Sequence, residues 1–197
     1  MDEAPGAVRP GLAQADPEPS DAPSARLGDG LTVWLTGLPS AGKTTIANGL
    51  AARLTDADFP VEILDGDDVR RVLGPELGFS REDRDRNVRR VGYVAELLSR
   101  HGVVVVCALV SPYRSTRDEV RAAHGGRFFE VFVAAPTAVC AQRDVKGLYV
   151  CQSAGEMKGL TGVDDPYEPP LRPELVVPSH TQTPEASIQA VWDALPR

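Results

Sequence analysis

The sequence predicts an α/β fold, a three-layer arrangement in which helices cover both faces of a parallel sheet. Two observations support this prediction. From residue 31 onward, short apolar runs alternate with longer segments of helical character, which is typical of strand–helix units in a parallel sheet. One apolar run, residues 103–110, contains no polar side chain apart from a cysteine thiol, as expected of a strand that is buried on both faces.

The composition fits a single domain and argues against several other classes of protein. A chain of 197 residues with 42% hydrophobic and 25% charged residues is long enough for one sizeable core. The net charge of −7 disfavours nucleic acid as a partner. No apolar run approaches the ~18 residues of a membrane span, and no secretion signal is recognisable. The three cysteines are too few for a disulfide framework, so we expect a reduced, cytoplasmic protein without membrane association.

Residues 1–29 differ from the remainder of the chain. They are rich in proline, alanine and carboxylates and contain almost no large apolar side chain. Such a segment cannot bury enough surface to offset the entropy lost on ordering it. We therefore predict a disordered N-terminal tail, residues 1–29, followed by one domain, residues 30–197. A tail that binds a partner is the alternative.

The pattern of apolar residues places the elements in order along the domain. Strands are expected at residues 31–36, 60–64, 103–110, 127–134 and 174–177. Helices are expected at residues 45–55, 69–73, 81–100, 114–123, 136–143 and 184–195. A capping box, Ser80 to Asp83, opens the third helix. Because ligands of parallel sheets bind beyond the carboxyl ends of the strands, the functional face should be formed by residues 37–44, 65–68, 111–113 and 135–136.

The loop after the first strand has the pattern G-x-x-x-x-G-K-[ST]. Its predicted ATP-binding residues are Gly37, Leu38, Pro39, Ser40, Ala41, Gly42, Lys43, Thr44 and the following Thr45. The glycines let backbone N–H groups turn inward around phosphate oxygens. Lys43 can bridge the outer phosphates, and Thr44 can offer its hydroxyl to Mg²⁺. The fold is therefore predicted to be that of the P-loop nucleoside triphosphate hydrolases and kinases.

Two carboxylates, Asp65 and Asp67, follow the second strand. In a phosphoryl-transfer enzyme they can hold the shell of a magnesium ion or accept the proton of the attacking hydroxyl. The alternative is an Asp-Gly turn followed by a helix cap. The neighbouring phosphate loop favours the catalytic interpretation.

Seven arginines crowd into a short stretch of this acidic chain. They are Arg70, Arg71, Arg81, Arg84, Arg86, Arg89 and Arg90. They could form a solvated helix face, paired with the carboxylates at positions 82, 83 and 85. They could equally grip a second anionic substrate. The residues by themselves leave both interpretations open.

Residues 144–172 form a long segment, rich in glycine and proline, without helical or strand periodicity. Loops of this length are usually functional or disordered. Its glycines permit hinge motion, and Lys146, Tyr149, Lys158 and Tyr167 could close over a nucleotide. Because kinases need to exclude water from the donor phosphate, we predict that this segment is a lid.

Longer motifs accompany these features, and through them the chain after residue 29 resembles the adenylyl-sulfate kinase family. The matching motifs are residues 37–44, 65–70, 78–80, 83–84 with Asn87, 89–90, 111–113, 143–149 and 158–168. The resemblance implies ATP-dependent phosphorylation of the 3′-hydroxyl of adenosine 5′-phosphosulfate, giving 3′-phosphoadenosine 5′-phosphosulfate. It also implies Mg²⁺ as cofactor and a homodimer, and it leaves open an ATP sulfurylase partner.

By position, the resemblance assigns the two sides of the site. The substrate-binding residues would be Asp67, Arg70, Phe79, Arg84, Asn87, Val110, Ser111, Lys158 and Leu160, with Phe79 stacked on the adenine. Arg143 and Lys146 would lie on the ATP side. The catalytic residues would be Lys43, Asp65, Asp67 and Ser111. Asp67 is the favoured general base and Asp65 the alternative.

Ser111 matches a serine described in the family as a phosphoserine intermediate. Its hydroxyl could equally ligate or orient, because in-line transfer between two bound nucleotides needs only positioning and charge neutralisation.

One stretch of three residues and two single positions depart from the family pattern. Residues 39–41 read Pro-Ser-Ala where many relatives carry Ser and Gly. Asp68 stands where Asn is usual, which adds negative charge beside an anionic substrate unless Arg70 or Arg71 neutralises it. Leu160 replaces a Phe, which removes a stacking contribution of about 1 kcal/mol. These changes bear on affinity more than on reaction type. The alternatives are a related P-loop kinase with another hydroxyl acceptor and a non-catalytic nucleotide-binding module.

Overall fold

Five parallel strands form one sheet in the computed structural model of the chain, which describes residues 23–197. The strand order is β2-β3-β1-β4-β5. The strands are β1 (Leu31–Thr36), β2 (Val61–Asp65), β3 (Val104–Ala108), β4 (Phe128–Ala134) and β5 (Leu175–Pro178). Each predicted strand is present, β1 with the predicted ends and the others with ends shifted by at most two residues.

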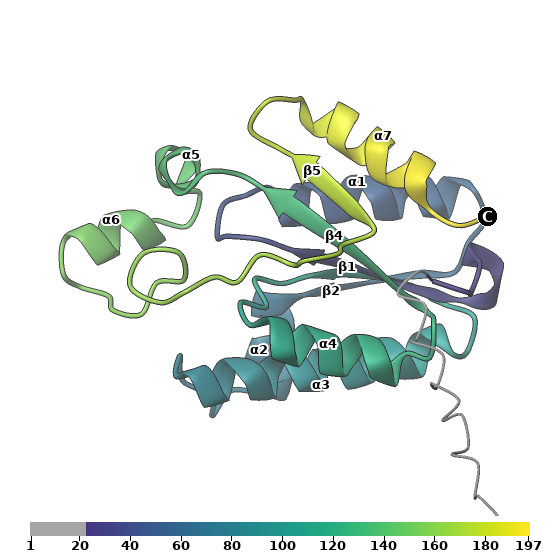
Figure 1. Ribbon diagram of the computed structural model, residues 1–197, viewed down its shortest axis with the longest axis horizontal. Helices are drawn as coiled ribbons and strands as arrows, with labels where there is room; N and C mark the ends of the chain where they lie inside the picture. Colours follow the sequence, from purple (N-terminus) through teal and green to yellow (C-terminus); the bar gives the residue numbers. More distant parts are fainter. Residues whose placement is uncertain (1–22) are drawn as a thin grey trace, which may run out of the picture.

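Helices cover both faces of the sheet, which confirms the predicted three-layer α/β fold (Figure 1). The helices are α1 (Lys43–Asp56), α2 (Gly66–Leu73), α3 (Arg81–Ser99), α4 (Arg114–Ala123), α5 (Thr137–Arg143), α6 (Leu148–Ser153) and α7 (Pro184–Ala194). Figure 1 shows α1 and α7 on one face and α2, α3 and α4 on the other. None of the helices within residues 23–197 is long and apolar enough to span a bilayer.

Alternation along the central strands supplies both layers of the core. Successive side chains of a strand point to opposite faces of the sheet. Val33 and Val106 therefore pack in the cluster that includes α1 and α7, whereas Trp34 and Cys107 pack with α3 and α4. The side chains of β3 are buried throughout, as its uninterrupted apolar sequence predicts.

The register of the sheet brings three strand ends to one edge. Ala108, the last residue of β3, pairs with Asp65 of β2 and with Leu35 of β1. The phosphate loop, the start of α2 and the segment after β3 consequently begin side by side. This confirms that the segments after these three strands share one face of the molecule.

Two elements differ from prediction, and in both an upstream aspartate accepts hydrogen bonds from N–H groups in the first turn of the helix. α2 begins at Gly66 rather than Val69, since the Asp65 carboxylate accepts a hydrogen bond from the Asp67 N–H at 3.0 Å. Residues 144–172 are not wholly irregular, because they contain α6. There the Asp144 carboxylate accepts from the N–H of Val150 at 3.0 Å. A helix of six residues is too short to show a 3.6-residue period.

The domain begins earlier than residue 30. The predicted disorder of residues 1–22 lies outside the described residues, but the rest of the predicted tail packs on the domain. Leu27 is 3% exposed and belongs to the core next to α1 and α7. Its N–H donates to the carbonyl of Pro196 at 3.1 Å, and the Ser24 N–H donates to the carbonyl of Gly126 at 3.0 Å. A single leucine in a polar stretch leaves no periodic pattern from which this packing could be predicted.

Replacing Leu27 by alanine tests this boundary. We expect Leu27→Ala to lower the free energy of unfolding by about 2–4 kcal/mol, because it removes a buried side chain and leaves a cavity. The matched control is Leu171→Ala at a side chain that is 78% exposed, for which we expect a change within about 0.5 kcal/mol. Urea unfolding measures both. Equal midpoints for the two variants would place residues 24–29 outside the domain.

Candidate active site

A cleft of about 1050 Å³ opens at the carboxyl ends of β1, β2 and β3. Small-molecule sites usually measure about 300–1,000 Å³, so this cleft has room for more than one ligand. Its walls are residues 39–46, the start of α2, residues 108–112 and residues 157–161. Every residue predicted to bind ATP, to bind the acceptor or to take part in catalysis lines it except Gly37 and Leu38, whose backbone carbonyls instead accept hydrogen bonds from Lys43.

The phosphate loop has the backbone that its glycines predict. Gly42 has φ 105° and Gly37 has φ 152°, and a Cβ on Gly37 would lie 2.5 Å from the carbonyl oxygen of Val133. Residues beyond the sheet brace the loop, since the Tyr149 hydroxyl donates to the carbonyl of Pro39 at 3.1 Å. The Ser179 hydroxyl donates to the carbonyl of Ala41 at 2.7 Å. The loop is thus held in one shape before any phosphate binds.

Lys43 lies folded against this loop. Its ammonium group donates to the carbonyls of Gly37 at 2.9 Å and Leu38 at 2.8 Å. Burial lowers the pKa of Lys43 to about 8, since removal from water disfavours the charged form. A nearby phosphate would favour the charged form again. The protonation of Lys43 is therefore sensitive to an anion in the cleft.

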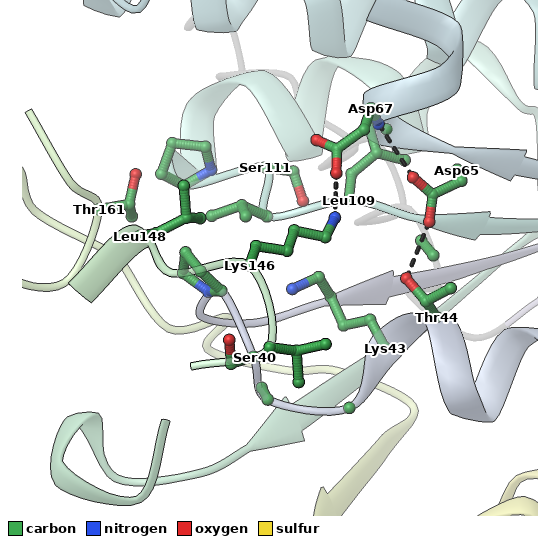
Figure 2. A pocket seen from close by; sticks show the side chains of 18 of the residues that line it. Ser40, Lys43, Thr44, Asp65, Asp67, Leu109, Ser111, Lys146, Leu148 and Thr161 are labelled. Atoms are coloured by element: carbon green, nitrogen blue, oxygen red, sulfur yellow. Dashed lines mark hydrogen bonds and ion pairs between the residues drawn. The ribbon is translucent and has the colours of Figure 1, made fainter. Parts of the chain in front are cut away.

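A chain of polar contacts joins the phosphate loop to the other side of the cleft (Figure 2). The Thr44 hydroxyl donates to the Asp65 carboxylate at 2.8 Å. The other oxygen of Asp65 accepts from the backbone N–H of Asp67, and the Asp67 carboxylate forms an ion pair with Lys146. Figure 2 shows the ammonium groups of Lys43 and Lys146 directed into the same space. Two cations and two carboxylates thus surround the region where phosphates would sit.

The opposite end of the cleft combines an exposed aromatic ring with arginines. The Phe79 ring is 63% exposed, and the guanidinium of Arg70 lies 4.5 Å from its centroid. Arg84 donates to the Phe79 carbonyl at 2.9 Å and to the Thr161 hydroxyl at 2.5 Å, and it pairs with Asp165 at 3.3 Å. Arg84 therefore ties the start of α3 to residues 159–165.

Asn87 lies beside this end and has an unused acceptor. It is 7% exposed, and its side-chain oxygen, although buried, has no hydrogen-bond partner within the described residues. Leaving a buried acceptor unpaired costs about 1–3 kcal/mol. A ligand with an N–H group would remove that cost.

The hydroxyl of Ser111 is engaged beneath the cleft. It accepts from the indole N–H of Trp34 at 3.1 Å and donates to the hydroxyl of Thr36 at 3.0 Å. Ser111 is 3% exposed and has φ 39°, a left-handed conformation that is uncommon outside glycine. The proton of the Ser111 hydroxyl is therefore already used in a hydrogen bond to Thr36 below the cleft.

The seven arginines of residues 70–90 fall into two groups, which correspond to the two interpretations that the sequence left open. Arg70 and Arg84 line the cleft. Four of the others make surface ion pairs, among them Arg89 with Glu119 at 2.7 Å and Arg71 with Asp68 at 2.8 Å, and Arg81 lies over the ring of Tyr113. Exposed ion pairs contribute little to stability. The pair of Arg71 with Asp68 nevertheless places a cation beside the extra negative charge at position 68, where the sequence departs from the family pattern.

Several lining residues were not predicted. Val145, Leu148 and Met157 come from the 144–172 segment, and Ser179, Gln182, Pro184 and Ser187 come from the turn after β5 and the start of α7. The rule that strand ends form the site points to the turn after β5, but no motif marks it. Tyr149 and Tyr167 do not line the cleft, contrary to their predicted role in closing over a nucleotide, because their hydroxyls bond to Pro39 and Thr36.

Comparison with known proteins settles the family. The family model described as adenylylsulphate kinase matches residues 29–178. The chain belongs to this family. An adenylyl-sulfate kinase of Rippkaea orientalis is 55% identical over 166 residues, which cover 84% of this chain and 91% of that protein. The chain is therefore an ATP-dependent kinase that phosphorylates adenosine 5′-phosphosulfate, and the non-catalytic alternative is set aside.

Solved structures of adenylylsulphate kinases have the same fold. The Mycobacterium tuberculosis APS kinase CysC, in complex with AMPPNP and APS, matches with a TM-score of 0.80 and 39% identity, covering 84% of this chain and 97% of that one. A hexameric APS kinase from Thiobacillus denitrificans matches with a TM-score of 0.65 and 35% identity. The match covers 86% of this chain but 29% of the Thiobacillus chain.

The lowered pKa of Lys43 predicts pH-dependent nucleotide binding. Above pH 8 the free enzyme must take up a proton to bind phosphates with a charged Lys43. The Kd for a non-hydrolysable Mg²⁺–ATP analogue should therefore rise up to about tenfold per pH unit above pH 8 and change little below pH 7. Titration calorimetry from pH 6.5 to 9.5 measures it. In Lys43→Arg, which stays charged, the rise should disappear. A flat profile in the unaltered enzyme would contradict this account.

Proposed function

We propose that the cleft holds ATP and adenosine 5′-phosphosulfate together and that the γ-phosphoryl group passes in line to the 3′-hydroxyl. The arrangement that supports this most directly is a single cleft with two unlike ends. One end is a phosphate loop with two ammonium groups, and the other is an aromatic ring flanked by arginines. The first fits a triphosphate and the second fits an anionic nucleotide with a stacking base.

On the donor side, residues 37–45 hold the ATP phosphates, with Lys43 and Lys146 against the outer ones. Arg143 braces the loop, because it donates to the carbonyls of Ala41 at 3.3 Å and Ser179 at 2.7 Å. Ser179 is one of the unpredicted residues after β5 that line the cleft. We assign them to the adenine end of ATP.

Thr44 and Asp65 would hold Mg²⁺. Both offer oxygen ligands, and their oxygens already lie 2.8 Å apart. Within the described part of the chain, no three His, Cys, Asp or Glu side chains are grouped to hold a metal by themselves. That suits Mg²⁺, which usually takes one or two protein ligands and completes its shell with phosphates and water. When bound, the ion would neutralise developing charge on the phosphates.

Asp67 is the better candidate for the general base. Both carboxylate oxygens of Asp65 are occupied, by Thr44 and by the Asp67 N–H. Asp67 has a single described partner, Lys146, and its side chain is 71% exposed at the cleft. Asp67 would accept the proton of the acceptor hydroxyl, while Lys146 moves to the phosphates of ATP.

In this proposal Ser111 orients its neighbours in the site through hydrogen bonds and is not phosphorylated. Its hydroxyl already accepts one hydrogen bond and donates another, and in-line transfer between two nucleotides requires no covalent intermediate.

On the acceptor side, Phe79 stacks on the adenine of adenosine 5′-phosphosulfate and Arg70 and Arg84 face its phosphosulfate. Asn87 accepts a hydrogen bond from the adenine amino group, which satisfies its unpaired oxygen. Val110, Lys158 and Leu160 complete this pocket. Leu160 is 5% exposed and packs in the core, so it can support the base by contact where a phenylalanine would stack.

Residues 144–172 would act as a lid over the two nucleotides. We further propose a cytoplasmic homodimer, on the family resemblance, without nucleic acid or membrane as a partner. The mass of the assembly in solution, measured by light scattering, distinguishes a dimer from a monomer or from a hexamer like that of the Thiobacillus protein.

Product analysis tests the proposed reaction. With ATP, Mg²⁺ and adenosine 5′-phosphosulfate, we expect ADP and a nucleotide phosphorylated at the 3′-hydroxyl, identified by phosphorus NMR. The 3′-deoxy analogue is the matched control and should give no product. Folded enzyme that phosphorylates the 3′-deoxy analogue, or that forms no product from the natural substrate, would overturn the proposal.

Substitutions at two neighbouring aspartates distinguish the loss of the general base from the loss of a nearby negative charge. Asp67→Asn should lower kcat by about 10²-fold or more, because it removes the proton acceptor. Asp68→Asn removes the same charge next to it, from a side chain paired with Arg71, and should leave kcat within about threefold. Steady-state kinetics measure both. If Asp67→Asn keeps its kcat, the role of base passes to Asp65.

A further inference from the structure

A second set of polar side chains lies buried beneath the cleft and outside its lining. Its centre is Arg117 on α4, which is 2% exposed. A buried guanidinium is costly unless its charge is paired and its N–H groups are bonded. Arg117 meets both conditions, and the partners it uses belong to segments that shape the cleft.

Each end of the Arg117 guanidinium contacts a different segment. Its Nε donates to the Glu130 carboxylate of β4 at 2.8 Å. One terminal nitrogen, Nη1, donates to the carbonyl of Ser111 at 2.6 Å, and the other, Nη2, donates to the carbonyl of Glu168 at 2.7 Å. Because the guanidinium is a rigid planar fork, it sets the separation of these two carbonyls. It thus joins the turn after β3 to the end of the 144–172 segment.

The residue before Glu168 makes a second connection, to the strand that carries the phosphate loop. The Tyr167 hydroxyl lies 3.0 Å from the hydroxyl of Thr36, the last residue of β1. Thr36 donates its own proton to the carbonyl of Val110 at 2.8 Å and accepts from Ser111. Tyr167 must therefore be the donor in the remaining bond. Burial raises the pKa of Tyr167 to about 12, so the phenol keeps this proton at neutral pH.

Glu168 makes two further hydrogen bonds that hold the chain at this point. Its N–H donates to the carbonyl of Pro112 at 2.9 Å, and its carboxylate accepts from the N–H of Arg114 at 2.9 Å. Upstream, the segment continues to Asp165 and Thr161, which hold Arg84, and to Lys158 in the cleft wall. The contacts at 167–168 therefore form the base from which the acceptor wall, residues 158–165, projects.

We propose that Arg117 and Tyr167 are positioning residues for the acceptor substrate: they hold the acceptor wall at a fixed distance from the phosphate loop. Neither side chain lines the cleft, so neither touches a nucleotide. Their loss would let residues 158–165 shift relative to Thr36 and would weaken the acceptor site. The phosphate loop has its own braces at Pro39 and Ala41 and would keep its affinity for ATP. This inference rests on the proposed placement of adenosine 5′-phosphosulfate against residues 158–165.

The experiment compares KM for the two substrates in four variants. Tyr167→Phe deletes one oxygen and should raise KM for adenosine 5′-phosphosulfate about three- to tenfold, with KM for ATP within twofold. Arg117→Lys keeps the charge but loses the fork, and should raise the acceptor KM at least tenfold with the same ATP value. Arg121→Lys is the control for a weakened core, because Arg121 pairs with Glu130 and Glu174 in the same buried network. It should lower Tm and leave both KM values within twofold.

Lys158→Ala tests the placement of the substrate independently. It should raise the acceptor KM, because Lys158 lines the cleft. If it does not, the placement fails and the inference with it. If it does, but Tyr167→Phe leaves the acceptor KM unchanged, the positioning role alone is wrong. Equal changes in both KM values, or a rise in Arg121→Lys as large as in Arg117→Lys, would also overturn it. Should Arg117→Lys not fold, Tyr167→Phe decides the question.

Discussion

Parallel pairing of β1 with β3, and of β3 with β2, is the constraint on which the site depends. A parallel ladder aligns the carboxyl ends of its strands, so the loops that follow them must start at one edge. Here Ala108 stands opposite both Asp65 and Leu35. A slip of one residue in either pairing would turn alternate side chains to the wrong face and would separate Thr44 from Asp65. The two faces of β1 and β3 pack in different layers of the core, so a slipped strand would place its side chains in the wrong layer.

Charge within the cleft is balanced locally, in a chain whose net charge is −7. Lys43 and Lys146 face Asp65 and Asp67 at the phosphate end, and Arg70 and Arg84 stand at the acceptor end. Below the cleft, Arg117 and Arg121 are matched by Glu130 and Glu174. The cations that line the cleft can contact anionic substrates. The charged side chains below the cleft form ion pairs with one another. In our proposal, binding and positioning are thus performed by separate groups of charges.

The sequence predicted the fold and about half of the residues that line the cleft, because both depend on local signals. Alternating apolar runs located the strands, and the phosphate loop and the longer motifs located the site. The predictions failed where a role depends on distant contacts. Leu27 and Tyr167 acquire their roles from residues about 100 or more positions away, and the residues after β5 belong to no motif. Arg117 resembles any helix arginine until Ser111 and Glu168 are seen beside it.

In our proposal, one cleft binds two nucleotides at once, each at its own end. Titration of adenosine 5′-phosphosulfate into enzyme saturated with a non-hydrolysable ATP analogue and Mg²⁺ tests it most directly. The predicted result is one acceptor bound per chain, without release of the analogue. Displacement of the analogue in proportion to the acceptor bound would show a single shared site and would contradict the account.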